Sequence, residues 1–72
     1  MGTVHKSAGQ ESVDDVVAAY DRNDFEAALG PFRRLAEQGD PLAQFYLGRM
    51  FSRGEAVVQD HAEAASWYLK SA

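Results

Sequence analysis

The chain has 72 residues, which is enough for one small domain, and its formal net charge is −4. This acidity argues against a nucleic-acid partner, because a phosphate-binding surface needs clustered Lys and Arg. The chain has no cysteine, which excludes disulfides and thiolate metal sites, and it has no apolar run long enough to span a membrane. These observations predict a soluble cytoplasmic protein without a membrane or nucleic-acid partner.

Residues 1–10 are small and polar and show no helical stripe, so we expect a flexible N-terminal tail before a folded domain over residues 11–72. The first predicted helix begins at Ser12, a good N-cap, and runs to about Arg22. Its many β-branched residues make it intrinsically weak, so tertiary packing must hold it. Its apolar side consists of Val13, Val16, Val17 and Tyr20.

The second predicted helix begins at Asp24 and ends at Gly39, which closes a first hairpin over residues 11–39. Pro31 lies in the middle of this helix, where proline removes a backbone hydrogen bond, so we expect a kink there. The apolar stripe of the helix consists of Phe25, Ala28, Leu29, Phe32, Leu35 and Ala36.

A second hairpin is predicted over residues 40–72. Its first helix begins at Asp40, with proline at the first helical position, and Gly54 ends it. Its second helix begins at Asp60, and Glu63 three residues later has the spacing of a capping box. The apolar stripes are Ala43, Leu47, Met50 and Phe51 in the first helix, and Ala64, Ala65 and Tyr68 beside Trp67 in the second.

The two hairpins resemble each other, since Asp24 aligns with Asp60 and Ala28 with Ala64. The sequence therefore predicts an all-α fold, an α/α superhelix fragment of two antiparallel helical hairpins with four helices. Such repeats normally need about three copies to bury their faces. Two explanations stay open: the chain belongs to a longer array, or it completes its core by self-association or helix exchange.

The second hairpin resembles a Sel1-like repeat, a relative of the tetratricopeptide repeat. The chain has Ala56 where that family usually has a second loop glycine, His61 where it has a tyrosine, and Tyr46 where it often has an asparagine. A non-glycine residue at position 56 resists a positive φ angle. The residues that carry the resemblance are Ala43, Leu47, Gly48, Phe51, Gly54, Val57, Asp60, Ala64, Trp67, Tyr68 and Lys70.

Few residues of the chain could act in catalysis or bind a metal or a cofactor. His5 and His61 have no cysteine or acidic partner at metal-ligand spacing, and no nucleophile motif or glycine-rich phosphate loop is present. Helix capping accounts for Asp14, Asp15 and Glu63. We therefore expect no enzymatic activity, no metal and no cofactor.

The resemblance implies that the first helix of each hairpin lines a concave face on which peptides or protein segments dock. Tyrosine and arginine together are typical of binding hot spots. We therefore predict a non-catalytic interaction module that binds a protein or peptide partner, or alternatively a structural element that forms homo-oligomers. The predicted partner-binding residues are Leu42, Tyr46, Arg49 and Arg53 on one helix, with Asp15 and Arg22 on the earlier one.

Overall fold

The computed structural model describes residues 12–72. The predicted tail, including His5, lies outside this range. The described residues form four helices and no strand, which confirms the all-α prediction. The helices are α1 (Val13–Asp21), α2 (Phe25–Glu37), α3 (Pro41–Arg53) and α4 (His61–Ser71).

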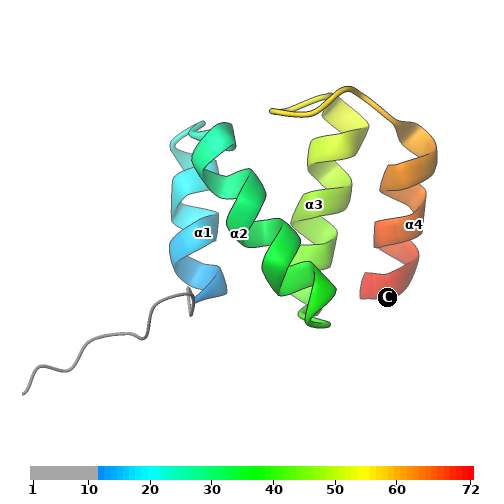
Figure 1. Ribbon diagram of the computed structural model, residues 1–72, viewed down its shortest axis with the longest axis horizontal. Helices are drawn as coiled ribbons and strands as arrows, with labels where there is room; N and C mark the ends of the chain where they lie inside the picture. Colours follow the sequence, from blue (N-terminus) through cyan, green and yellow to red (C-terminus); the bar gives the residue numbers. More distant parts are fainter. Residues whose placement is uncertain (1–11) are drawn as a thin grey trace, which may run out of the picture.

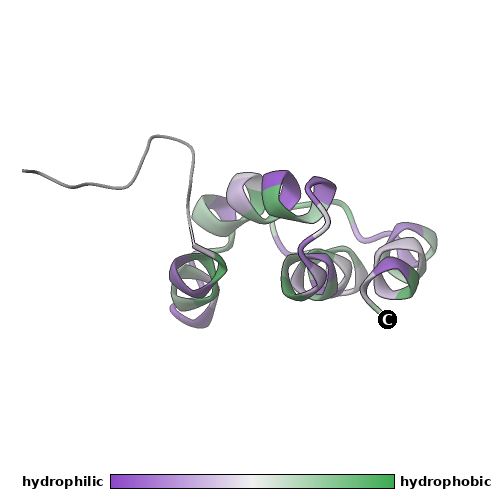
Figure 2. Cartoon of the chain, turned by 90° about the horizontal axis from the view of Figure 1, so that it is seen from below, coloured by the Kyte–Doolittle hydropathy of each residue, from purple (hydrophilic) through white to green (hydrophobic). Residues whose placement is uncertain are grey.

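Consecutive helices run antiparallel and each packs on the next, so the chain forms two hairpins side by side (Figure 1). Seen along the helices, α1 and α3 lie on the same side of α2, and α4 lies beside α3 (Figure 2). The connection within the first hairpin is residues 22–24, whereas residues 54–60 connect the helices of the second. The first connection is therefore the shorter one.

The predicted N-caps are all in place, although they differ in hydrogen bonding. Side-chain oxygens of Ser12 and Asp40 accept bonds from backbone N–H groups of α1 and α3, and Asp60 Oδ1 accepts from Glu63 N at 3.0 Å. In a full capping box, the Glu63 side chain would accept a hydrogen bond from the Asp60 N–H. Here the Asp60 N–H donates to the Phe51 carbonyl instead. Asp24 is the N-cap of α2 without a side-chain cap bond.

The ends of α1 and α2 are both closed by a left-handed residue. Gly39 has a φ of 98°, and its N–H donates to Ala36 O while the Asp40 N–H donates to Leu35 O. This pair of bonds is a Schellman motif, which satisfies carbonyls that the helix leaves open. Asn23, with a φ of 67°, plays the same part at the end of α1.

Pro31 lies inside α2 without interrupting it. Proline cannot donate the bond that the Ala27 carbonyl would accept. Ala27 is exposed, so water can solvate that carbonyl. The apolar stripe of α2 supplies the remaining stability, since Ala28, Phe32 and Ala36 are buried.

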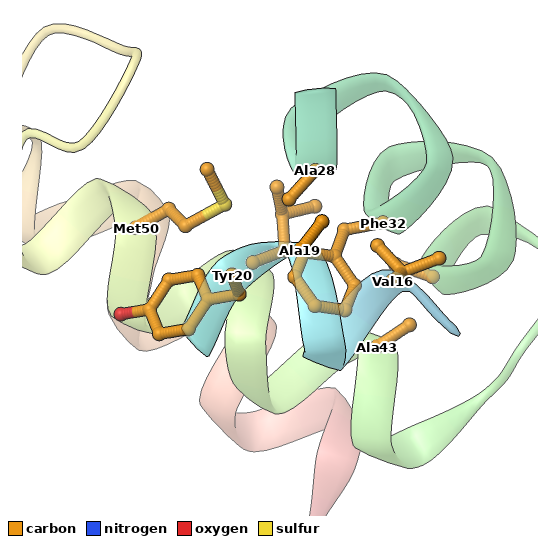
Figure 3. Close-up of a cluster of buried hydrophobic side chains, with 9 residues drawn as sticks. Val16, Ala19, Tyr20, Ala28, Phe32, Ala43 and Met50 are labelled. Carbon is orange, nitrogen blue, oxygen red and sulfur yellow. The ribbon is translucent and has the colours of Figure 1, made fainter. Parts of the chain in front are cut away.

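The core lies between α1, α2 and α3 (Figure 3). Phe32, Leu47 and Met50 are its largest fully buried side chains. The predicted stripes of α1, α2 and α3 all contribute to it, which confirms their helical phase. Its buried members are Val16, Ala19, Tyr20, Ala28, Phe32, Ala36, Ala43, Leu47 and Met50.

Helix α4 packs along α3, and the two helices approach most closely at Gly48. A Cβ atom placed on Gly48 would lie 2.9 Å from the ring of Tyr68 and 3.1 Å from the carbonyl oxygen of Ala64. These distances are shorter than van der Waals contact, so only glycine fits here. Ala64 is the only residue of α4 that is buried.

The predicted apolar stripe of α4 is partly wrong, because Ala65 is exposed. Trp67 is half-buried and packs against the core, and Tyr68 is half-buried over Gly48. The large apolar side chain that α4 leaves in solvent is Leu69, which is 77% exposed. Among the described residues, no helix is both long and apolar enough to cross a membrane.

Candidate protein-binding surface

Tyr20, near the end of α1, is the centre of an aromatic cluster that joins three helices. Its ring centroid lies 5.1 Å from that of Phe25, 6.2 Å from that of Phe32 and 5.1 Å from that of Tyr46. Its hydroxyl points away from the side chains of Val16 and Ala43 (Figure 3). The ring therefore belongs to the core, while the polar end reaches the edge of the surface between α1 and α3.

Tyr46, one of the predicted partner-binding residues, is half-buried and not fully exposed. Its ring stacks parallel on Phe32 at 5.2 Å and meets Tyr20 edge-on, and the residue is half-buried against the core. The reason is the position of α1, whose Tyr20 covers this side of α3. The Tyr46 ring therefore contributes mainly to packing against the core. Its neighbour Phe45 is the more exposed aromatic residue, at 40%.

Glu55, in the connection between α3 and α4, brings a carboxylate to this surface. The Tyr20 hydroxyl donates a hydrogen bond to Glu55 Oε1 at 2.6 Å, and Arg53 Nη1 lies 3.8 Å from Glu55 Oε2. Burial and the bond to Glu55 raise the pKa of Tyr20 to about 12, while Arg49 and Arg53 act in the opposite direction. The two arginines, the tyrosine and the glutamate thus form one electrostatic cluster.

Arg49 lies one turn before Arg53 on the same side of α3. The residue is half-buried, and its Nε atom is buried without a hydrogen-bond acceptor among the described residues. Both guanidinium groups are close enough to Tyr20 to lower its pKa. The structure thus brings Tyr46, Arg49 and Arg53 of the predicted site together, around Tyr20 and Glu55. We call these five residues the arginine surface.

The other predicted site residues lie outside the arginine surface. Leu42 is 41% exposed at the start of α3, about 16 Å from Arg53 along a helix that rises about 1.5 Å per residue. Asp15 is exposed in the first turn of α1, and Arg22 is exposed at its C-cap.

Sequence reasoning missed the roles of Tyr20 and Glu55 at this site. Tyr20 was assigned to the core because of its helical phase, and this assignment is correct for its ring. Helical phase does not indicate where the hydroxyl group lies. Glu55 is in an irregular connection, where no periodic pattern indicates direction. Gln44 was also missed: it is buried in α3, and its Nε2 donates to the Ala36 carbonyl at 3.0 Å.

Other parts of the described chain offer little chemistry. Residues 12–72 contain no group of three His, Asp or Glu side chains arranged to hold a metal ion. One hollow of about 320 Å³ lies between the two connections, and no nucleophile or histidine lines it. Its lining residues are Asn23, Asp24, Phe25, Glu26 and Ala56.

Comparisons of the chain with protein-family models, with curated proteins and with solved structures find no match. The resemblance to Sel1-like repeats thus stays a prediction from the residues themselves.

Proposed function

We propose that the protein is a non-catalytic interaction module that binds an acidic segment of a partner protein at the arginine surface. The observation that supports this most is the pairing of Arg49 and Arg53 on one side of α3. A guanidinium group binds a carboxylate through two parallel hydrogen bonds, so two such groups on a rigid helix favour a negatively charged partner.

The surroundings of the two arginines support this proposal. Tyr46 lies about one turn before Arg49 on α3, and its ring packs on that of Tyr20 at 5.1 Å, so the core holds both aromatic rings of the arginine surface in place. Side chains held this way lose little entropy on binding.

The Sel1-like resemblance belongs to the same proposal, since repeats of this kind are expected to present the first helix of each hairpin to a partner. A cytoplasmic location is part of it as well. It agrees with the complete lack of cysteine in the chain.

The double substitution Arg49→Ala, Arg53→Ala tests the proposal. The probe is a fluorescent peptide in which Glu alternates with Leu, and its matched control has Gln in place of every Glu. We expect the wild-type chain to bind the Glu peptide and the double variant to bind it about tenfold or more weakly, as for two charge-assisted contacts. Fluorescence anisotropy measures both affinities, and circular dichroism checks that the variant is folded.

Equal binding of the Glu peptide by both proteins would reject the arginine surface as the binding site. Arg33→Ala, Arg34→Ala serves as the control variant, because it removes two positive charges from α2, outside the arginine surface. A loss of binding in both double variants would indicate that only net charge matters.

A self-associating structural element is the second candidate. It is favoured by the exposure of Leu69, at 77%, and of Val58, at 87%, in the half of the molecule formed by α4 and the connection before it. Apolar side chains exposed to this degree in a small domain are candidates for contact with another copy.

A further inference from the structure

Glu55 already occupies part of the surface that the proposed function assigns to a partner. Its side chain is only 15% exposed, and its two carboxylate oxygens face Tyr20 on one side and Arg53 on the other. The backbone contributes to this placement, because Gly54 adopts a φ of 71° and turns the chain back toward α1 directly after α3. A carboxylate from the connection therefore lies where the carboxylate of a partner would bind.

The two contacts of Glu55 differ in strength. The hydrogen bond from Tyr20 is short, at 2.6 Å, whereas the 3.8 Å separation from Arg53 is too long for a hydrogen bond and describes a loose ion pair. Arg53 is 54% exposed, so water screens the attraction. The charge of Arg53 is therefore partly neutralised by an internal carboxylate that holds it only weakly, while its side chain stays accessible to a partner.

We propose that Glu55 is an internal competitor for the acidic side chain of the partner at Arg53. This inference rests on the proposed function and adds its regulation: the partner's Asp or Glu binds Arg53 by replacing Glu55, which moves away with the connection over residues 54–60. The shape of this connection supports the partner chemistry. Glu55 is presented by an irregular segment, and an extended peptide with an acidic side chain can take the same place.

The charges at Arg53 explain why we expect a partner carboxylate to replace Glu55 and not to bind beside it. The arginine surface carries two guanidinium groups and one carboxylate, and a second carboxylate at Arg53 would stand beside Glu55 with the same charge. Two carboxylates on the same side of Arg53 would repel each other, so we expect the arriving carboxylate to replace Glu55 at that side. The competition lowers the affinity of every acidic partner and selects those that make additional contacts.

The variant Glu55→Gln tests the inference. Glutamine is the same size and its side-chain oxygen can still accept the bond from Tyr20, so the fold is kept while the competing charge is removed. We expect Glu55→Gln to bind the Glu peptide about threefold more tightly than wild type, in line with a loose surface ion pair. Binding of the Gln peptide is expected to stay unchanged.

Glu63→Gln is the matched control, because it removes the same charge from an exposed position on α4. A second readout follows the wild-type chain itself. If the peptide displaces Glu55, Tyr20 loses its hydrogen bond, and its ring resonances shift in proportion to occupancy in an NMR titration.

The outcomes separate the two proposals. Binding that depends on Arg49 and Arg53 but is unchanged or weakened by Glu55→Gln, with unmoved Tyr20 resonances, would overturn the competitor role and leave the proposed function standing. Equal tightening by Glu63→Gln would also overturn it, since net charge would then explain the effect. Absence of any binding to the wild-type chain would reject the proposed function itself.

Discussion

Tyr20 shows how one side chain serves both the core and the surface. Its ring is buried among aromatic residues from α2 and α3, and its hydroxyl bonds to Glu55 in the connection that follows α3. This hydrogen bond joins residues far apart in the sequence and ties the second hairpin to the first. A single tyrosine therefore couples the packing of α1 to the position of the arginine surface.

The raised pKa of Tyr20 predicts a loss of stability at alkaline pH. The pKa is about 12 in the folded chain against 10.0 for an ordinary tyrosine, so the folded state keeps its proton more firmly. The stabilisation is fully present below about pH 10 and is lost as pH rises toward about 12. Urea unfolding should show a fall of roughly 1–3 kcal/mol over this interval, in keeping with about 1.4 kcal/mol for each unit of pKa difference.

Tyr20→Phe provides the control for this measurement. Phenylalanine keeps the ring packing and cannot ionise, so the decrease over the same pH interval should be much smaller in the variant. A decrease of equal size would show that another group causes it.

Ala56 is a residue at which the chain tolerates an unfavourable backbone conformation. The sequence analysis expected a non-glycine residue there to resist a positive φ, yet Ala56 adopts a φ of 63°. Its neighbours hold it in place: the Glu55 side chain is fixed by Tyr20, and Gln59 Nε2 donates to the Ser52 carbonyl at 2.9 Å. Local contacts therefore outweigh a cost of about 1–2 kcal/mol for the left-handed conformation.

At the level of elements, the contact between α3 and α4 depends on the lack of a side chain at Gly48. The Tyr68 ring lies over this position, and the Ala64 carbonyl is close to it. Gly30, in α2, is different, because a Cβ placed there would have the flexible end of Arg34, at 3.7 Å, as its nearest atom beyond the neighbouring residues and the backbone of α2. The two helical glycines thus have different reasons to be present.

This contrast predicts effects of different size for the same substitution. Gly48→Ala should destabilise the chain by about 1–3 kcal/mol, because the added methyl group forces α4 away from α3. Gly30→Ala should change the stability by less than about 1 kcal/mol, because the helix preference of alanine is offset by crowding between its Cβ and the ring of Pro31. Thermal unfolding followed by circular dichroism measures both, and a stabilised Gly48→Ala variant would contradict the packing described for α3 and α4.

At the scale of the whole molecule, the two hairpins are not buried to the same degree. Helices α1, α2 and α3 share the core, whereas α4 contributes one buried residue and packs mainly on α3. Helix α4 therefore leaves a large apolar side chain in solvent, that of Leu69, which is 77% exposed. This asymmetry is the physical basis of the self-association candidate.

Leu69→Glu tests that candidate. Self-association through α4 predicts that light scattering coupled to size exclusion finds a mass above that of one chain at high concentration. It also predicts that the charged side chain in the variant restores the monomer. A wild-type chain that stays monomeric at all concentrations would exclude this function.

The helices, their caps and three of the four apolar stripes could be predicted from the sequence, because they depend on residues within a few positions of one another. Ser12, Asp40 and Asp60 cap their helices as predicted, and the stripes of α1, α2 and α3 face the core. A period of 3.6 residues fixes which side chains share a face before any tertiary contact forms.

Which helix faces stay exposed could not be predicted in the same way, because exposure depends on how the helices pack on one another. Tyr46 was expected to bind a partner but is half-buried, because α1 covers the side of α3 that carries it. Ala65 was expected in an apolar stripe but is exposed, because no described element covers it. The bond between Tyr20 and Glu55 likewise joins a helix to an irregular connection that carries no periodic signal. Periodicity describes the faces of one helix, whereas their exposure depends on where the other helices lie.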